Sequence, residues 1–176
     1  LRLIQLLEQN EGIALPPGVA YLSLGSEGRH EQTLRTDQDS ALVYRDDFPP
    51  DQMPVLERFA GRLIDCLELL GVPRCPGNTM ATNPQWRHSM TEWMSILETW
   101  ISTPLQDNVV NFGMFQDMRV MHGELSFEAE LRDHIYKTAH SMSLFFPSMA
   151  RNIVRFKPPI GRSEERRVGK ECRSRW

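Results

Sequence analysis

The chain has 176 residues, of which 40% are hydrophobic and 24% charged, and its formal net charge is −3. This composition is ordinary for one globular domain, or for a domain with part of a second, and gives no reason to expect disorder. The most apolar stretches are far shorter than the roughly 18–20 residues of a membrane-spanning helix, and no signal-peptide pattern is found. We therefore expect no membrane partner.

Both ends of the chain are treated separately. The chain begins at Leu1 inside a helical pattern and without a methionine, so we expect it to be a segment of a longer protein. Residues 162–176, RSEERRVGKECRSRW, closely resemble a translated sequencing-adapter read-through, and we expect a non-native tail there. Without the six basic and three acidic residues of this tail, 14 basic and 20 acidic residues remain. A nucleic-acid partner is therefore not expected, because such binding depends mainly on Lys and Arg side chains that neutralise phosphates.

Two cysteines, Cys66 and Cys75, remain outside this tail. They have neither metal-ligand spacing nor the density of a disulfide scaffold, so we expect reduced thiols in a cytoplasmic protein. Cys66 falls on a predicted helix and is expected to be a small buried hydrophobic residue. The five histidines show no ligand spacing either, so we expect no zinc site.

Hydrophobic spacing predicts an α+β chain. The predicted elements, in chain order, are a helix at 1–10, strands at 19–24 and 40–44, helices at 51–70 and 90–101, a strand at 113–121, and a mostly helical stretch at 124–154 that Pro147 breaks. Residues 71–90 are rich in proline, asparagine and threonine, which predicts an ordered loop. Trp86, Trp93 and Trp100 could stack a base, but the helical spacing of the last two favours the core.

Two aspartates stand just before the second predicted strand. Asp37 and Asp39 are two residues apart, and on extended backbone such side chains point to one face while Gln38 points away. Two like charges held close are unfavourable unless a divalent cation lies between them, and Mg²⁺ commonly takes one or two carboxylates with substrate phosphates. The pair therefore indicates a metal and triphosphate site in outline. Taken alone, the same spacing is also common in surface turns.

A glycine-rich segment follows the first predicted strand. Gly25, Ser26, Gly28 and Arg29 stand directly after it, where glycines let the backbone approach a phosphate. Ser26 adds a hydroxyl group, and Arg29 adds a fixed positive charge. The segment fits neither the Walker A pattern nor the dinucleotide fingerprint. A plain turn is the alternative for this segment taken alone.

A third acidic candidate, Asp117, lies in the segment MFQDMRVMHGE. Strand alternation there would place Phe115, Asp117 and Arg119 on one face, with the aspartate among apolar neighbours. A lone acid in a buried strand is costly unless it is paired or bound to a metal. Either Arg119 pairs with Asp117, or Asp117 completes the metal site, where it could help deprotonate an attacking hydroxyl. The residues alone leave both alternatives open.

The segment NPQWR offers further polar side chains. Asn83, Gln85 and Arg87 could contact a nucleotide or hold the loop in place, and an Asn-Pro pair commonly serves turns. The loop-holding role is the favoured interpretation.

Together these residues resemble the nucleotidyltransferase family whose best-known member is the PII uridylyltransferase GlnD. The matching pattern is G-S-x-G-R-x-E-Q-x-x-x-T-D-x-D, from Gly25 to Asp39. The segments CPGNTMATNPQWR, FQDMRVMHGE and KPPIG are similar to the branch usually found behind cyclic-nucleotide-binding and CBS domains in bacterial signalling proteins. The resemblance runs from about Leu22 to Gly161.

The resemblance implies a polymerase-β-like nucleotidyltransferase fold, a small mixed sheet flanked by helices. It also implies a two-metal Mg²⁺ site and a triphosphate site. The implied metal ligands and catalytic acids are Asp37, Asp39 and Asp117, and the implied triphosphate-binding residues are Gly25, Ser26, Gly28 and Arg29. The implied domain organisation is an N-terminal helix and linker at 1–18, the nucleotidyltransferase domain at 19–123, a truncated C-terminal helical region at 124–161, and the tail at 162–176.

The implied reaction transfers a nucleoside monophosphate from an NTP to an acceptor hydroxyl, and pyrophosphate leaves. Uridylylation of a PII protein is the family's example, while the acceptor and the base of the NTP stay open. The alternative is a regulatory module that binds nucleotide without turnover, coupled to upstream CBS or cyclic-nucleotide-binding domains. A structural helical adaptor is the least favoured alternative, because it leaves the glycine-rich segment beside the acids unexplained.

Overall fold

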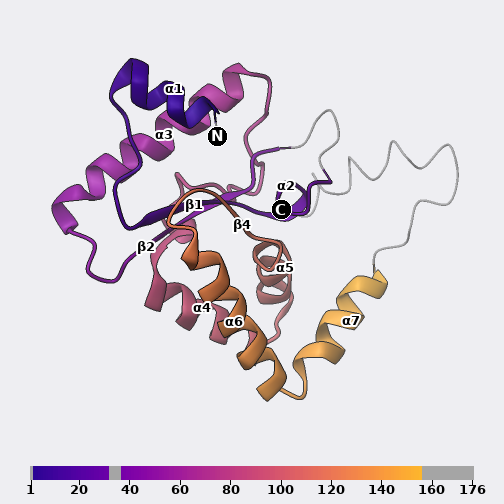
Figure 1. The fold of residues 1–176 in the computed structure, drawn as a ribbon. Coiled ribbons are helices and arrows are strands. Elements are labelled where there is room, and N and C mark those ends of the chain that lie inside the picture. The colour runs from indigo at the N-terminus through magenta and orange to yellow at the C-terminus, as the bar shows by residue number, and fades with distance from the viewer. Residues whose placement is uncertain (1, 32–36, 156–176) are drawn as a thin grey trace, which may run out of the picture.

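The computed structural model describes residues 2–31 and 37–155 (Figure 1). Residues 32–36, the segment KPPIG and the expected tail at 162–176 lie outside the described residues. The described elements, in chain order, are α1 (Arg2–Glu11), β1 (Val19–Ser23), α2 (Gly25–Gly28), β2 (Ser40–Tyr44), the 3₁₀ turn η1 (Pro50–Gln52), α3 (Met53–Leu69), the 3₁₀ turn η2 (Pro84–Trp86), β3 (Arg87–Ser89), α4 (Met90–Ser102), α5 (Gln106–Phe115), β4 (Arg119–Gly123), α6 (Ser126–Ser141) and α7 (Phe145–Arg155). None of the described helices is long and apolar enough to cross a membrane.

Within the described residues, four strands form one mixed sheet in the order β3-β2-β1-β4. β1 is central and pairs antiparallel with both β2 and β4, while β2 and β3 pair in parallel. Every residue of β1 is buried, because helices cover both faces of the sheet at its centre. This small mixed sheet flanked by helices confirms the predicted fold class.

Helices α1 and α3 cover one face of the sheet (Figure 1). Leu56, Phe59 and Leu63 recur along α3 at helical spacing and lie in one core with Leu7 of α1 and Tyr21 of β1. The amphipathic pattern predicted at 51–70 therefore faces the sheet.

Helices α4, α5 and α6 cover the opposite face (Figure 1). Trp86, Trp93 and Trp100 are all buried in this second core, which confirms the favoured interpretation of them as core residues. The indole Nε1 of Trp93 donates a hydrogen bond to the backbone carbonyl of Leu42 at 2.9 Å. This bond satisfies the polar end of a fully buried side chain and fastens α4 to β2.

The strand predicted at 113–121 is wrong in its first half. Helix α5 continues to Phe115, and β4 begins only at Arg119. Val109, Phe112 and Phe115 are the buried residues of α5, so the helical period of the core contacts overrides the apparent alternation.

Pro147 does not break the C-terminal helical stretch. The break lies at 142–144, and Pro147 is the third residue of α7. A proline in a first helical turn is tolerated because the N–H that it lacks would have no partner in the helix. Phe145 of α7 packs edge-to-face on Phe112 of α5, and Met149 of α7 packs against the same core.

The segment 71–90, predicted as an ordered loop, also supplies the edge of the sheet. It contains η2 and β3, and β3 is only three polar residues long, too short for a strand pattern. The Asn83 side chain accepts a hydrogen bond from the backbone N–H of Gln85 at 3.1 Å and donates one to the carbonyl of Asn78 at 3.0 Å. Asn83 therefore holds the loop in place, as the favoured interpretation expected.

Candidate active site

The three acidic candidates lie at the end of the sheet where the central strand β1 stops. Both neighbours of β1 run antiparallel to it, so both begin at this end. Asp37 and Asp39 immediately precede β2, and Asp117 lies in the turn before β4. The short helix α2 follows β1 at the same end (Figure 1). The topology therefore gathers residues that are far apart in the sequence.

The buried side chain of Gln38 anchors the segment that carries the aspartate pair. Its amide donates to the backbone carbonyl of Val72 at 2.8 Å and to that of Ile64 at 3.3 Å. Its backbone N–H also donates to the carbonyl of Pro73 at 3.0 Å. The side chains on either side of Gln38, those of Asp37 and Asp39, lie close together, as the alternation predicted.

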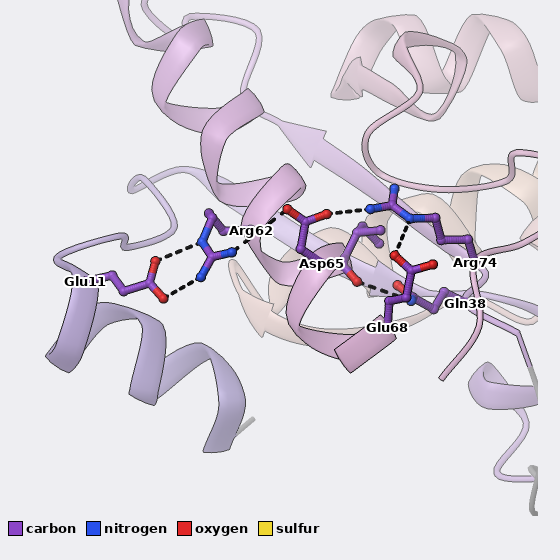
Figure 2. A network of polar contacts seen from close by, with 7 residues as sticks. Glu11, Gln38, Arg62, Asp65, Glu68 and Arg74 are labelled. Atoms are coloured by element: carbon purple, nitrogen blue, oxygen red, sulfur yellow. Dashed lines mark hydrogen bonds and ion pairs between the residues drawn. The ribbon is translucent and has the colours of Figure 1, made fainter. Parts of the chain in front are cut away.

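A network of ion pairs holds the loop after α3 against that helix. The guanidinium of Arg74 pairs with Asp65 and, at 2.8 Å, with Glu68, while Arg62 pairs with Glu11 of α1 (Figure 2). These pairs are exposed, so each contributes little to stability, but together they define where the loop runs. Cys75 is the next residue after Arg74, so the same loop brings it close to Asp37 and Asp39.

Cys75 joins the two aspartates in one cluster. Potential ligand atoms of Asp37, Asp39 and Cys75 all lie within 4.8 Å of one another. Burial raises the pKa of the Cys75 thiol to about 11, and the charge of Asp39 contributes to the rise. The thiol therefore stays protonated at neutral pH beside the Asp39 carboxylate.

The ionised form of Asp39 is destabilised in this cluster. Burial raises its pKa to about 6, the charges of Asp37 and Glu27 add to the rise, and the hydrogen bond from Cys75 opposes it. A divalent cation between the two carboxylates would remove this penalty. Two carboxylate oxygens are ligands that Mg²⁺ accepts, whereas a protonated thiol is a poor ligand for it. The donor set therefore fits a hard cation held by the aspartates.

Helix α2 fits between the two acidic segments because it carries glycine at both ends. Gly25 has a φ of +53°, and a Cβ there would lie 3.2 Å from Oδ2 of Asp39. At Gly28 a Cβ would lie 1.9 Å from the backbone carbonyl oxygen of Asp117, which no side chain could tolerate. Ser26, between these glycines, is half-buried. The predicted phosphate-binding segment thus touches the chain at both acidic sites.

Asp117 pairs with Arg29, which is neither of the partners that the sequence left open. The guanidinium of Arg29 bridges Asp117 and Glu31, the latter at 2.8 Å. Arg119 instead donates to the backbone carbonyl of Glu27 at 3.0 Å. Asp117 lies in a turn and not in the predicted buried strand, so its side chain is free to face Arg29. It is outside the cluster of Asp37, Asp39 and Cys75.

Residues 1–107 match the protein family described as "Putative nucleotidyltransferase DUF294". The chain belongs to this family. No curated protein matches the chain. The family assignment supports nucleotidyl transfer as the class of activity, with an NTP as the substrate, and it agrees with the small mixed sheet of the fold. The match includes Asp37 and Asp39 and ends ten residues before Asp117.

Sequence reasoning missed the place of Cys75 in the cluster. It treated both cysteines by their spacing alone, although Cys75 begins the segment CPGNTMATNPQWR that carries part of the resemblance. The contact depends on a parallel bridge between Gln38 and Arg74, and no local pattern predicts the register of such a bridge.

Proposed function

We propose that this chain is a Mg²⁺-dependent nucleotidyltransferase that moves a nucleoside monophosphate from an NTP to an acceptor hydroxyl. One observation carries the proposal: two carboxylates converge beside a glycine-rich turn whose first glycine lies directly against one of them. The raised pKa of Asp39, caused first by burial and then by the charges of Asp37 and Glu27, supports the proposal, because a bound cation would offset it.

In this proposal Asp37 and Asp39 hold the metal and α2 lies at the triphosphate. Gly25 and Ser26 would offer backbone N–H groups to the phosphates, since the first N–H groups of a helical turn have no partner within it. The N–H of Gly28 already donates to the carbonyl of Leu24, so Gly28 would contribute by its missing side chain. Mg²⁺, when bound, would neutralise charge on the entering and departing oxygens. Positioning and charge neutralisation then account for most of the catalysis.

Asp117 is proposed to act at the acceptor. The acceptor oxygen forms a bond to the α-phosphorus, the bond to the bridging oxygen of pyrophosphate breaks, and the acceptor proton passes to a base. Asp117 is the proposed base: its backbone carbonyl lies against Gly28 at one end of α2, and Asp39 lies against Gly25 at the other end. Arg29 would leave Asp117 for the triphosphate when the nucleotide binds, because the phosphate charge is the stronger attraction.

The proposed nucleotide, acceptor and regulatory partners are taken from the resemblance. Transfer of UMP to a PII-like protein is the first reaction to test, and upstream CBS or cyclic-nucleotide-binding domains are the proposed regulatory partners in a longer protein. A cytoplasmic setting, with free NTP and Mg²⁺, suits this chemistry.

A regulatory module that binds nucleotide without turnover is the second candidate. The ion pair between Arg29 and Asp117 favours it, because Arg29 occupies the carboxylate that a transferase would use as its base, and Asp117 lies outside the cluster of Asp37, Asp39 and Cys75.

Calorimetric titration of each NTP, with and without Mg²⁺, tests the proposal on a chain without residues 162–176. We expect Mg²⁺-dependent binding that Asp37→Ala and Asp39→Ala each abolish, while Asp51→Ala, at an exposed carboxylate in η1, leaves it unchanged. NTP binding that is unchanged without Mg²⁺ and in both aspartate variants would overturn the transferase mechanism. Radiolabel transfer from α-labelled NTP to candidate proteins then separates the candidates, because Asp117→Asn should retain NTP binding and lose transfer only in an enzyme.

A further inference from the structure

A hollow of about 500 Å³ opens between the segment 77–88 and helices α4 and α5. Its walls include the indoles of Trp86 and Trp100 and the side-chain amides of Gln85 and Asn111, with Gly77 and Thr79 beside them. Drug-sized ligands occupy pockets of about 300–1,000 Å³ that combine apolar walls with a few polar groups. The volume of the hollow falls within that range, and its lining combines apolar and polar groups.

The hollow lies on the face of the sheet toward which the aspartates point. Asp37 and Asp39 share their alternation with Ala41 and Val43, and both of these residues belong to the core that α4 and α5 cover. Trp86 is in that same core. Asn111 likewise lies on α5, which also contacts α2. Helix α5 thus contributes Asn111 to the hollow and also contacts the proposed phosphate-binding turn.

The loop after α3 leads from the carboxylates to the hollow. At one end Cys75 lies beside Asp39, and the potential ligand atoms of the two residues are within 4.8 Å of each other. At the other end the backbone carbonyl of Thr79 accepts a hydrogen bond from the N–H of Ser40 at 3.0 Å, and Thr79 lines the hollow. A ligand with phosphates at the aspartates would extend its other end along this loop into the hollow.

We propose that this hollow holds the nucleobase and ribose of the NTP, and that Gln85 and Asn111 read the edge of the base. This proposal rests on the proposed function, since it assigns the non-reacting half of the same substrate. A side-chain amide offers both a donor and an acceptor, which is what the edge of a base presents. Neither amide hydrogen-bonds to another described residue through its side chain, so both are available to a ligand. Trp86 and Trp100 are mainly core residues, 5% and 9% exposed, and the indole surface that they leave uncovered at the hollow supplies an apolar wall for the base.

The test compares NTPs with inorganic tripolyphosphate, a probe that has the phosphates and lacks the base. Titrations in Mg²⁺ compare the parent protein with the variants Gln85→Ala and Asn111→Leu. Gln106→Ala is the matched control, because Gln106 is exposed on α5 and does not line the hollow. We expect each hollow variant to weaken the preferred NTP about tenfold, the loss typical of one or two hydrogen bonds, and to leave tripolyphosphate binding unchanged. The control should change neither. Gln85 is exposed, so its variant should fold even if Asn111→Leu does not, and thermal unfolding of each variant checks this.

The outcomes separate the base pocket from the transferase site. If Asp37→Ala abolishes NTP binding and the hollow variants with intact folds bind NTP normally, the base pocket is wrong and the transferase site stands. If the hollow variants weaken NTP while Mg²⁺ and the aspartates do not matter, the pocket stands and the transferase site fails. Equal weakening of NTP and tripolyphosphate by the hollow variants overturns the pocket, because a base contact cannot affect a ligand without a base.

Discussion

The side-chain amide of Gln38 donates to the backbone carbonyl of Val72 at 2.8 Å, and the carboxylates on either side of Gln38 lie together in the cluster with Cys75. Gln38 is 2% exposed, so the bond is made in a dry environment. One buried amide thus ties the position of the candidate metal ligands to the end of α3.

Replacing Gln38 by alanine should therefore damage both stability and the site. The carbonyls of Val72 and Ile64 would lose their donor, and we expect the free energy of unfolding to fall by about 1–3 kcal/mol. Urea denaturation measures this loss, with Gln106→Ala as an exposed control that should stay within about 0.5 kcal/mol of the parent. Mg²⁺-dependent NTP binding should weaken as well. Normal binding in a destabilised variant would show that Gln38 supports the fold alone.

Substitution of Asp39 by asparagine should stabilise the metal-free protein at neutral pH. The pKa of Asp39 is raised from an ordinary value of 3.8 to about 6 in the folded state, so the unfolded state loses its proton first. The stabilising contribution is then complete below about pH 4 and disappears as the pH rises through 6, a loss of up to about 3 kcal/mol. Unfolding measured in EDTA at pH 4 and pH 7.5 should show Asp39→Asn more stable than the parent only at pH 7.5.

Adding Mg²⁺ provides the complementary measurement. The cation should raise the unfolding temperature of the parent at pH 7.5, because it binds only the folded pair of carboxylates, and should have little effect on Asp39→Asn. Equal stabilisation of both proteins would place the cation elsewhere.

Alanine at Gly28 should disturb α2 and the turn before β4 together. The new Cβ would collide with the carbonyl oxygen of Asp117 at 1.9 Å, and we expect a loss of about 1–3 kcal/mol as one segment shifts. Gly61→Ala is the matched control, because Gly61 lies within α3 and its Cβ would meet nothing within 4 Å. That control should gain about 0.5–1 kcal/mol from improved helix propensity. Chemical denaturation of the two variants measures the expected loss and the expected gain in the free energy of unfolding. A Gly28→Ala variant as stable as the parent would contradict the tight packing of α2.

The reactivity of Cys75 should report the charge on Asp39. Burial and the neighbouring carboxylate raise the pKa of this thiol to about 11, so alkylation by iodoacetamide at pH 8 should be slow. In Asp39→Asn the negative charge is gone, the thiol pKa falls, and the reaction should accelerate. Peptide mass spectrometry follows Cys75 and Cys66 separately, and Cys66 serves as the internal control. Acceleration at both cysteines would indicate general loosening of the fold.

Local patterns in the sequence predicted the central part of the fold. The short apolar runs that form β1 and β2 and the helical spacing of α3 and α4 are each contained within one element. The boundary between α5 and β4 was not predictable in the same way, because Phe112 and Phe115 owe their burial to α4 and α7 and not to neighbours along the chain. β3 escaped prediction because a three-residue polar edge strand has no pattern of its own.

In the candidate site, too, local spacing predicted some features while others depend on tertiary contacts. The D-x-D spacing placed Asp37 and Asp39 together because it depends only on the alternation of an extended chain. The contact of Cys75 with Asp39 and the choice of Arg29 as the partner of Asp117 depend on strand pairing and on the position of α2. Those relationships require the three-dimensional fold. The catalytic role of Asp117 and the phosphate-binding roles around Ser26 stay predictions.

The central position of β1 has a consequence for any shortened version of the protein. A chain cut after Asp107, where the family match ends, would lose β4 and leave one side of β1 with unpaired N–H and carbonyl groups. It would also remove Phe115 and Met118 from the core around Trp93. An apolar strand with an open edge is a template for self-association, so such a fragment should aggregate. The segment by which the family is recognised thus lacks one strand of the described sheet and part of its core.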